Sequence, residues 1–519
     1  MNRFSRLLAL LMSLCLMVSL LASCGGNTDS GGSTADAGKD TFTVALDSDI
    51  VKLDPAFAYD FTTNPVVNQI TQGLLTFDED NQLQPMLASS WEQKDDLTYV
   101  YQIRDDVTFS DGSAMTMDDV LYSMNRIKDP ATASYLSWMY DNVASIEQTG
   151  DWELTVTLST PDATWQYVPA TTAGHVISKA YAEQVGDKLG TPEGGLVGTG
   201  PYKFVDWTKG ASVTLVANDE YWGEAPKVKN LVFKIIAEGN TRLTSLMNGE
   251  CDIISSVDPS SADQVTSNGF ELFSEDGMTI NYMAFNTETG QCTDQEVRKA
   301  VAQAINVEEM VQAIYGDYAT VANSVMPTWM APYAKDVKQT AYDPEAAKKT
   351  LADKGITSLQ CITYTTARPY NQKGGSQLAN MIQGYLSEVG VDVSITEYDW
   401  TTYKTKVQTD PYDICFYGWT GDNGDPDNFM NLLADTNWSM NVAHFQDDEY
   451  KALIAQGVDT PDGDERDAIY LKCEEMVAEK QPWVLISHSK NLLGINPKVK
   501  DFYYHPTGVA FFKGVSKEA

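Results

Sequence analysis

The chain has 519 residues, and its 72 acidic side chains outnumber 36 basic ones, which gives a formal net charge of −36. Nucleic acids and anionic lipid surfaces attract clustered Lys and Arg, so this charge argues against both as partners. Hydrophobic residues make up 43% of the chain, enough to fill more than one core, and we expect two or more lobes.

The first residues have the layout of an export signal. Arg3 and Arg6 precede an apolar run from Leu7 to Leu21, and the segment ends in Leu-Ala-Ser-Cys at Cys24. The run is shorter than the roughly 20 residues that a membrane-spanning helix needs. Its ending resembles a bacterial lipobox, which implies that residues 1–23 are a lipoprotein signal peptide and that Cys24 carries the lipid. The alternative is a plain secretory signal with an incidental cysteine.

Residues 24–40 are predicted to be a flexible tether. After Cys24 the segment consists almost entirely of Gly, Ser, Thr, Asp, Asn and Ala, and it has no large apolar residue. We therefore expect the folded part to be exported and held on the membrane, at the cell surface or the periplasmic face, by lipidated Cys24.

The first half of the folded part is predicted to be rich in strands. Short apolar or alternating runs are typical of strands. They span Phe42–Leu46, Tyr99–Ile103, Leu154–Leu158, Val213–Ala217 and Leu231–Ile236.

From about residue 290, long helical patterns alternate with strands. The predicted helices are Glu296–Tyr315, Pro344–Lys354, Gln377–Val389 and Glu465–Glu479. The predicted strands are Cys361–Tyr364, Val393–Tyr398, Ile414–Tyr417 and Trp483–Ser487. Such alternation favours an α/β fold in which helices pack against a sheet.

The cysteines give no framework for disulfides or zinc. Five of them follow the lipobox, far apart and without a CxxC pair: Cys251, Cys292, Cys361, Cys415 and Cys473. Because Cys361 and Cys415 lie inside apolar strand candidates, we interpret them as small core residues.

One loop follows a predicted apolar strand and carries a tryptophan together with three acidic side chains. Between Tyr412 and Phe429 the chain reads YDICFYGWTGDNGDPDNF, so that Asp422, Asp425 and Asp427 follow Trp419. A solvated turn is the simplest interpretation. Recognition of a cation is another, because a charge pair at about 4 Å is worth ~4 kcal/mol at an effective dielectric of about 20 and ~1 kcal/mol in water. An indole face would add a cation–π attraction.

Motifs for enzyme chemistry are absent from the sequence. It contains no HExxH, GxSxG, GxxxxGK[ST] or complete GxGxxG. The acidic loop lacks the spacing of an EF-hand, and a glycosidase pair would need two carboxylates at a set separation. The four histidines are too scattered to form a local metal pair: His175, His444, His488 and His505. We therefore predict no enzyme activity, no metal site and no cofactor.

Several segments together resemble the extracellular solute-binding proteins of family 5, which serve peptide and nickel ABC importers. They are residues 50–60 (IVKLDPAFAYD), 88–112 (ASSWEQKDDLTYVYQIRDDVTFSDG), 197–204 (VGTGPYKF), 297–306 (VRKAVAQAIN) and 343–355 (DPEAAKKTLADKG). The resemblance runs from about residue 41 to the end of the chain.

The resemblance implies roles for individual residues of the loop. GWTGDNGDPDNF is similar to the dipeptide-binding branch, which implies that Asp422 pairs with the α-ammonium group of a ligand. Gly418 and Trp419 would line the pocket, and residues 425–427 would shape the loop.

The opposite end of such a ligand is assigned less directly. Residues 365–382 read TTARPYNQKGGSQLANMI and resemble dipeptide binders around PYN, but those carry arginine where this chain has Lys-Gly-Gly-Ser at 373–376. Arg368 is the nearest planar donor. It could clamp a carboxylate at two points, or it could belong to a structural ion pair.

The fold implied by the family is α/β, a two-lobed periplasmic-binding-protein-like fold with an extra inserted subdomain in the first lobe. Lobe one would comprise residues 41–285 and 488–519, with the insertion at about 79–194, and lobe two residues 286–487. The lobes would close on the ligand about a hinge.

The function implied is that of a lipid-anchored, monomeric substrate-binding protein of an ABC importer. It would capture di- or oligopeptides between two closing lobes and deliver them to permease subunits in the membrane. An alternative is the same fold binding a nickel chelate, haem, glutathione or an oligosaccharide. A second alternative is a surface hydrolase that uses the acidic loop.

Overall fold

The computed structural model describes residues 40–60, 62–78, 81–330, 336–421, 423–434, 439–506 and 510–518. The chain divides into two compact units, Met1–Asp40 and Thr41–Ala519. The predicted signal peptide, Cys24 and all but the last residue of the predicted tether lie outside the described residues. In the described part of the chain, no helix has both the length and the apolar character needed to cross a bilayer.

A mixed sheet of 12 strands runs through the second unit. Its first half contains β10 (Tyr202–Thr208), β11 (Ser212–Ala217), β12 (Asn230–Ile235), β1 (Thr41–Leu46) and β13 (Ile253–Ile254), in that order. The order continues through β20 (Trp483–Ile495), β15 (Thr279–Phe285), β19 (Ile414–Thr420), β17 (Ser358–Tyr364) and β18 (Asp392–Tyr398). Two further strands, β14 (Glu271–Asp276) and β16 (Ala319–Val321), pair with β20.

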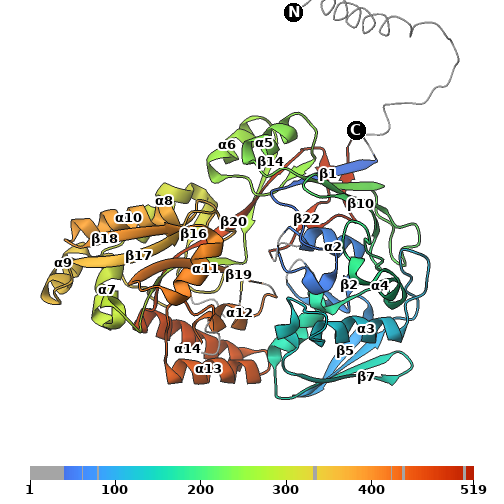
Figure 1. Ribbon diagram of the computed structural model, residues 1–519, viewed down its shortest axis with the longest axis horizontal. Coiled ribbons are helices and arrows are strands. Elements are labelled where there is room, and N and C mark those ends of the chain that lie inside the picture. The colour runs from blue at the N-terminus through green and yellow to red at the C-terminus, as the bar shows by residue number, and fades with distance from the viewer. Residues whose placement is uncertain are drawn as a thin grey trace, which may run out of the picture. The chain divides into compact units, whose positions relative to one another are not determined.

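Strand β20 joins the two halves of this sheet (Figure 1). Its first residues pair with β15, and its last residues pair with β13 and β14. The neighbouring chain crosses between the same two halves at Gly277, where a Cβ atom would lie 2.9 Å from the carbonyl oxygen of Ser489. Two adjacent chain segments therefore connect the halves.

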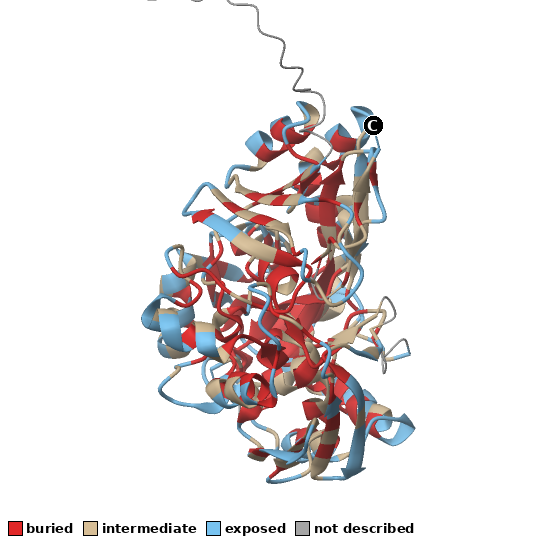
Figure 2. Ribbon diagram, turned by 90° about the vertical axis from the view of Figure 1, so that its right-hand side faces the viewer, coloured by how far each residue is buried: buried red, intermediate tan, exposed pale blue. Residues whose placement is uncertain are grey.

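Each half of the sheet has its own hydrophobic core. One core draws its members from Met278 to Ile486, and another combines residues between Phe42 and Ile253 with residues between Leu493 and Val515. Buried residues follow the strands in the middle of the molecule, while exposed residues gather on the outer helices, the loops and some outer strands (Figure 2). Strand β19 is buried from Ile414 to Gly418, as expected of a central strand that is covered on both faces.

A separate antiparallel sheet of four strands lies in the first third of the chain. Its order is β5 (Ala88–Asp95), β6 (Thr98–Ile103), β8 (Glu153–Leu158) and β7 (Val143–Gly150). Helix α3 (Met117–Lys128) packs on it, and a third core takes its members from residues 56 to 176. The predicted bounds of the two lobes and of the insertion at about 79–194 stay predictions.

Short strand pairs and helices complete the described unit. The pairs are β2 (Gln72–Gly73) with β9 (His175–Val176), β3 (Leu75–Phe77) with β4 (Leu83–Pro85), β21 (Val499–Lys500) with β24 (Ser516–Lys517), and β22 (Tyr503–Tyr504) with β23 (Ala510–Phe511). The further α-helices are α2 (Asn64–Ile70), α4 (Lys179–Val185), α5 (Gly239–Met247), α6 (Ala262–Ser267), α7 (Gln295–Gln303), α8 (Val307–Tyr315), α9 (Pro344–Asp353), α10 (Gly375–Glu388), α11 (Trp400–Thr409), α12 (Asp427–Met430), α13 (Asp448–Asp459) and α14 (Asp464–Lys480).

The predicted helix over Glu296–Tyr315 is wrong as a single element. The structure has α7 and α8 with a break at residues 304–306. Helix α7 ends at Gln303 with Ala304 as its C-cap, and Asn306 starts α8 as its N-cap, since its side chain accepts a hydrogen bond from the Glu309 amide. The other three predicted helices and all nine predicted strands are confirmed to within a few residues, except at the carboxyl end of β20. Cys361 and Cys415 are confirmed as buried core residues.

Candidate functional site

A cavity of ≈ 700 Å³ opens between two stretches of chain that are distant in sequence. One wall comes from positions between Ala58 and Thr172, and the other from positions between Trp419 and Met440. The second stretch begins at the end of β19, where the loop predicted to carry function starts. The structure therefore brings that loop to the edge of this cavity.

Trp419 lines this cavity. It is half-buried, and its Nε1 donates a hydrogen bond of 2.8 Å to Oδ1 of Asn428, which also lines the cavity. The chain passes next through Gly421, where a Cβ would lie 2.7 Å from the ring of Phe429. A glycine is required at that point because the backbone runs so close to the underlying core.

Asp422 lies outside the described residues. Its neighbours Gly421 and Asn423 both line the cavity. The predicted pairing of Asp422 with a ligand ammonium group stays a prediction.

Gly418 is buried beneath Tyr370 and is not among the described residues that line the cavity. A Cβ at this position would overlap the Tyr370 ring and lie 2.5 Å from the carbonyl oxygen of Ile280. In the structure the glycine serves close packing. Its predicted role as a ligand contact stays a prediction.

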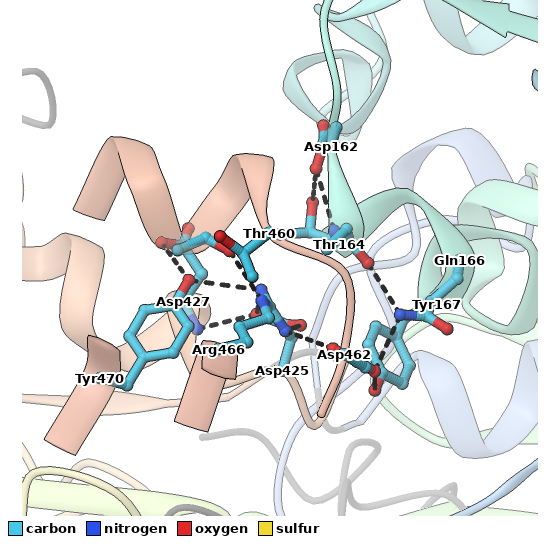
Figure 3. A network of polar contacts seen from close by, with 12 residues as sticks. Asp162, Thr164, Gln166, Tyr167, Asp425, Asp427, Thr460, Asp462, Arg466 and Tyr470 are labelled. Carbon is cyan, nitrogen blue, oxygen red and sulfur yellow. Dashed lines mark hydrogen bonds and ion pairs between the residues drawn. The ribbon is translucent and has the colours of Figure 1, made fainter. Parts of the chain in front are cut away.

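Asp425 forms a buried ion pair. Its carboxylate is bound at two points by Arg466, with Nη1 at 2.7 Å from Oδ2 and Nη2 at 2.9 Å from Oδ1 (Figure 3). Asp425 has no exposed surface, and Arg466 is 1% exposed. This pair anchors the loop to α14, which agrees with a structural role for Asp425.

Asp427 follows at the start of α12 and lines the cavity. Its carboxylate accepts a hydrogen bond from the Tyr470 hydroxyl at 3.2 Å and one from the Asn431 amide at 3.3 Å. Burial, together with the nearby charge of Asp425, raises the pKa of Asp427 to about 7. Asp427 is therefore a carboxyl group that exchanges its proton near neutral pH.

The same network crosses to the opposite wall. Arg466 also donates to Oδ1 of Asp462 at 2.7 Å. The other oxygen of Asp462 accepts hydrogen bonds from the Tyr167 hydroxyl at 2.6 Å and the Gln166 amide at 2.8 Å (Figure 3). Tyr167 in turn stacks on the cavity-lining ring of Phe77, with centroids 6.3 Å apart. A continuous set of contacts thus connects the loop, which forms part of one wall, to the opposite wall.

A second contact between the walls lies at Gly424, which has φ +75°. A Cβ there would overlap the side-chain amide of Asn81. Only glycine satisfies both the left-handed backbone and the close approach of Asn81.

Arg368 lies near the cavity but not among the described residues that line it. Its guanidinium stacks on Trp400, with Cζ 4.3 Å from the ring centroid. Among the described residues no carboxylate pairs with it, and its buried Nε has no hydrogen-bond partner. Burial raises the pKa of Tyr59, a lining residue, and the charge of Arg368 acts in the opposite direction. Arg368 as a ligand contact stays a prediction.

Lys373 is engaged elsewhere, since its Nζ lies 2.6 Å from the carboxylate of Asp258. Within the described ranges, no three His, Cys, Asp or Glu side chains are grouped so that they could hold a metal ion.

The network that joins Asp425, Arg466, Asp462 and Tyr167 was not predicted from the sequence. A signal was present at Arg466, the only cation in a helix start that also carries Asp464, Glu465 and Asp467. A cation is unfavourable next to the positive end of the helix dipole, so its presence there indicates a specific acidic partner. Asp462 and Tyr167 gave no such signal, because their contact depends on tertiary structure.

The family model described as bacterial extracellular solute-binding proteins, family 5 (middle) matches residues 82–441. The chain belongs to this family. The family 5 protein is 29% identical to heme-binding protein A of Haemophilus influenzae, over 97% of this chain and 98% of that protein. It is 27% identical to the dipeptide-binding protein of Escherichia coli, over 89% of this chain and 90% of that protein.

Solved structures similar to the family 5 protein share its fold. HbpA2 from Haemophilus parasuis superposes with a TM-score of 0.83 at 26% identity, covering 92% of this chain and all of that one. DppA from Helicobacter pylori, a periplasmic binding protein in complex with the peptide STSA, gives a TM-score of 0.78 at 26% identity over 94% of this chain. The predicted two-lobed α/β fold of periplasmic binding proteins is thereby confirmed.

Proposed function

We propose that this family 5 protein is the substrate-binding component of an ABC importer that captures di- or oligopeptides between its two lobes. The observation that supports this most is the cavity of ≈ 700 Å³, bordered on one side by the loop after β19. Cavities of about 300–1,000 Å³ with a few polar groups are typical of sites for small ligands. Relatives named as peptide binders support the choice of ligand.

The peptide would lie with its amino group against the loop. Asp422 would pair with the ammonium group, and Trp419 would supply an aromatic wall. At about 4 Å the charge pair is worth ~4 kcal/mol at an effective dielectric of about 20, and closure of the lobes would keep water away from it. Arg368, which has no acidic partner among the described residues, would be the donor available to a ligand carboxylate.

Lobe one would comprise residues 41–285 and 488–519 with the insertion at about 79–194, and residues 286–487 would form lobe two. Cys24 would anchor the protein to the outer face of the membrane. Delivery to membrane permease subunits would follow capture, with the binding protein acting as a monomer.

Isothermal titration calorimetry of the purified protein with a panel of short peptides tests the proposal. We expect one-to-one binding that Asp422→Asn weakens at least tenfold. Asp392→Asn is a matched control, because it removes the same charge from an exposed position at the start of β18. Absence of peptide binding, or equal binding by the Asp422→Asn variant, would contradict the proposal.

The lipid anchor is tested by fractionation of cells. We expect the wild-type protein in the membrane fraction and a Cys24→Ala variant in the soluble fraction. A wild-type protein that is soluble, or a variant that stays on the membrane, would contradict anchoring by Cys24.

A further inference from the structure

Three aromatic rings on one wall of the cavity are unusually exposed. Tyr59, Tyr135 and Trp138 are 52%, 53% and 51% exposed, and all three line the cavity. They are three of seven large hydrophobic residues with strong exposure in the described part of the chain. Their concentration at one site indicates a binding surface rather than scattered surface rings. We name these three residues the aromatic face.

Two rings of the aromatic face, those of Tyr59 and Tyr135, are held by packing against neighbouring rings. Tyr135 packs edge-to-face on Tyr59 with centroids 5.2 Å apart, and on Phe57 with centroids 5.3 Å apart. The backbone amide of Tyr135 donates to the carbonyl oxygen of Ala56. The segment that holds Tyr59 is therefore tied to the segment that holds Tyr135 and Trp138.

A buried ring fixes the far end of the same segment. Tyr140 is fully buried, packs edge-to-face on Trp165 at 5.1 Å, and its hydroxyl donates to the carbonyl oxygen of Ala173 at 2.9 Å. Rings held in this way lose little conformational freedom on binding, which favours their use as contacts for a ligand.

The charge of the cavity limits what can bind there. Asp141 and Asp427 are the only Asp, Glu, Lys or Arg side chains among the described lining residues, so the lining carries no cation. Two cations close to the walls have acidic partners, Arg126 in Asp54 and Arg466 in Asp425, which leaves Arg368 as the cation available for a single ligand carboxylate. The cavity therefore favours a ligand with a positive group and a large apolar group over a polyanion.

The wall that faces the aromatic face mixes apolar side chains, such as Leu432 and Met440, with several polar groups. It contains the side-chain amides of Asn423, Asn428 and Asn431 together with the indole of Trp419. Side-chain amides offer both donors and acceptors, which suits a peptide backbone lying between the two walls.

We propose that the aromatic face is a subsite for an aromatic side chain of the peptide ligand, so that the protein selects peptides that combine a free amino group with Phe, Tyr or Trp. This rests on the proposed capture of peptides. An aromatic side chain that moves from water onto these rings buries apolar area that an alanine side chain does not offer. Full burial of a Phe side chain corresponds to about a tenfold or greater gain in affinity.

Calorimetry with Ala-Phe, Ala-Trp and Ala-Ala tests the proposal, and the readout is the ratio of affinities rather than any single affinity. We expect the wild-type protein to bind Ala-Phe and Ala-Trp about tenfold or more tightly than Ala-Ala. Trp138→Ala and Tyr59→Leu should each lower this ratio to about threefold or less. Tyr342→Ala is the matched control, because Tyr342 is an exposed aromatic residue outside the lining and the ratio should persist.

The possible outcomes separate this inference from the proposed function. Equal affinity of the wild-type protein for the three peptides overturns the aromatic subsite while peptide capture stands. Failure of all three peptides to bind, with binding of haem instead, overturns both. If one variant does not fold, the wild-type ratio and the other variant still decide the question.

Discussion

Arg466→Met is the change that tests the structural account of the loop most severely. It leaves Asp425 without its bidentate partner in a site where that carboxylate has no exposed surface. Arg466 also donates from Nε to the carbonyl oxygen of Gly457 at 2.8 Å. Removal of one partner from a buried ion pair costs about 3–5 kcal/mol, because the other charge stays buried and uncompensated. We expect a loss of that size in the free energy of unfolding.

The assay is urea unfolding followed by tryptophan fluorescence at pH 8 and at pH 5. Without Arg466, the folded-state pKa of Asp425 rises, since burial already raises it in the presence of the arginine. A raised folded-state pKa means that the native carboxyl holds its proton where the unfolded one has lost it. The loss of unfolding free energy in Arg466→Met, relative to the wild type, should therefore be largest at pH 8 and smaller at pH 5.

A matched double variant separates the lost interaction from the buried charge. Asp425→Leu combined with Arg466→Met removes both charges, and we expect it to regain at least about 1 kcal/mol of the loss in the single variant. A single variant within about 1 kcal/mol of wild type would contradict the cost expected for a buried unpaired carboxylate. A double variant as unstable as the single one would contradict it as well.

Glu474 is fully buried, and burial raises its pKa to about 7, so its contribution to stability falls as pH rises through 7. From pH 5 to 8 the wild type should lose ~2–3 kcal/mol of unfolding free energy relative to Glu474→Gln. If thermal unfolding gives the two proteins the same dependence of stability on pH, the prediction is contradicted. Gly418→Ala should destabilise the protein by ~1–3 kcal/mol, because the added Cβ overlaps a packed ring. Its control is Gly384→Ala, in an exposed helix position with open space around the Cβ, which should stabilise the protein by ~0.5–1 kcal/mol. Urea unfolding that changes the stability of both variants in the same direction would exclude the packing argument. Tyr167→Phe removes the hydroxyl that donates to Asp462 and so links the two sides of the cavity. It should speed ligand release by about three- to tenfold in stopped-flow fluorescence. An unchanged release rate would show that this contact does not hold the walls together.

Elements of regular structure were predictable because their patterns are local. The apolar stripe of α10 and the continuous apolar run of β19 each specify one element, and the cap at Asp343 with Pro344 marks the start of α9. The break between α7 and α8 was missed, because the apolar period continues through residues 304–306 and only the capping bond of Asn306 reveals it.

The site was predictable only in part. Trp419 and the acidic loop stood out because an aromatic residue and three carboxylates follow a buried strand. The partner of Asp425 could not be found in this way, because Arg466 lies on another helix and meets it only through folding. The exposure of Tyr59, Tyr135 and Trp138 was hidden for the same reason, since sequence patterns do not distinguish an exposed ring from a core ring.

Mass spectrometry of the ligand that remains bound through purification tests whether the cavity captures peptides. The protein would be purified under native conditions and its ligand released by denaturation. We predict a mixture of short peptides, present in the wild-type sample and depleted in the Asp422→Asn sample. A single non-peptide species, such as haem or a metal chelate, present equally in both samples, would contradict capture of peptides in the cavity beside β19.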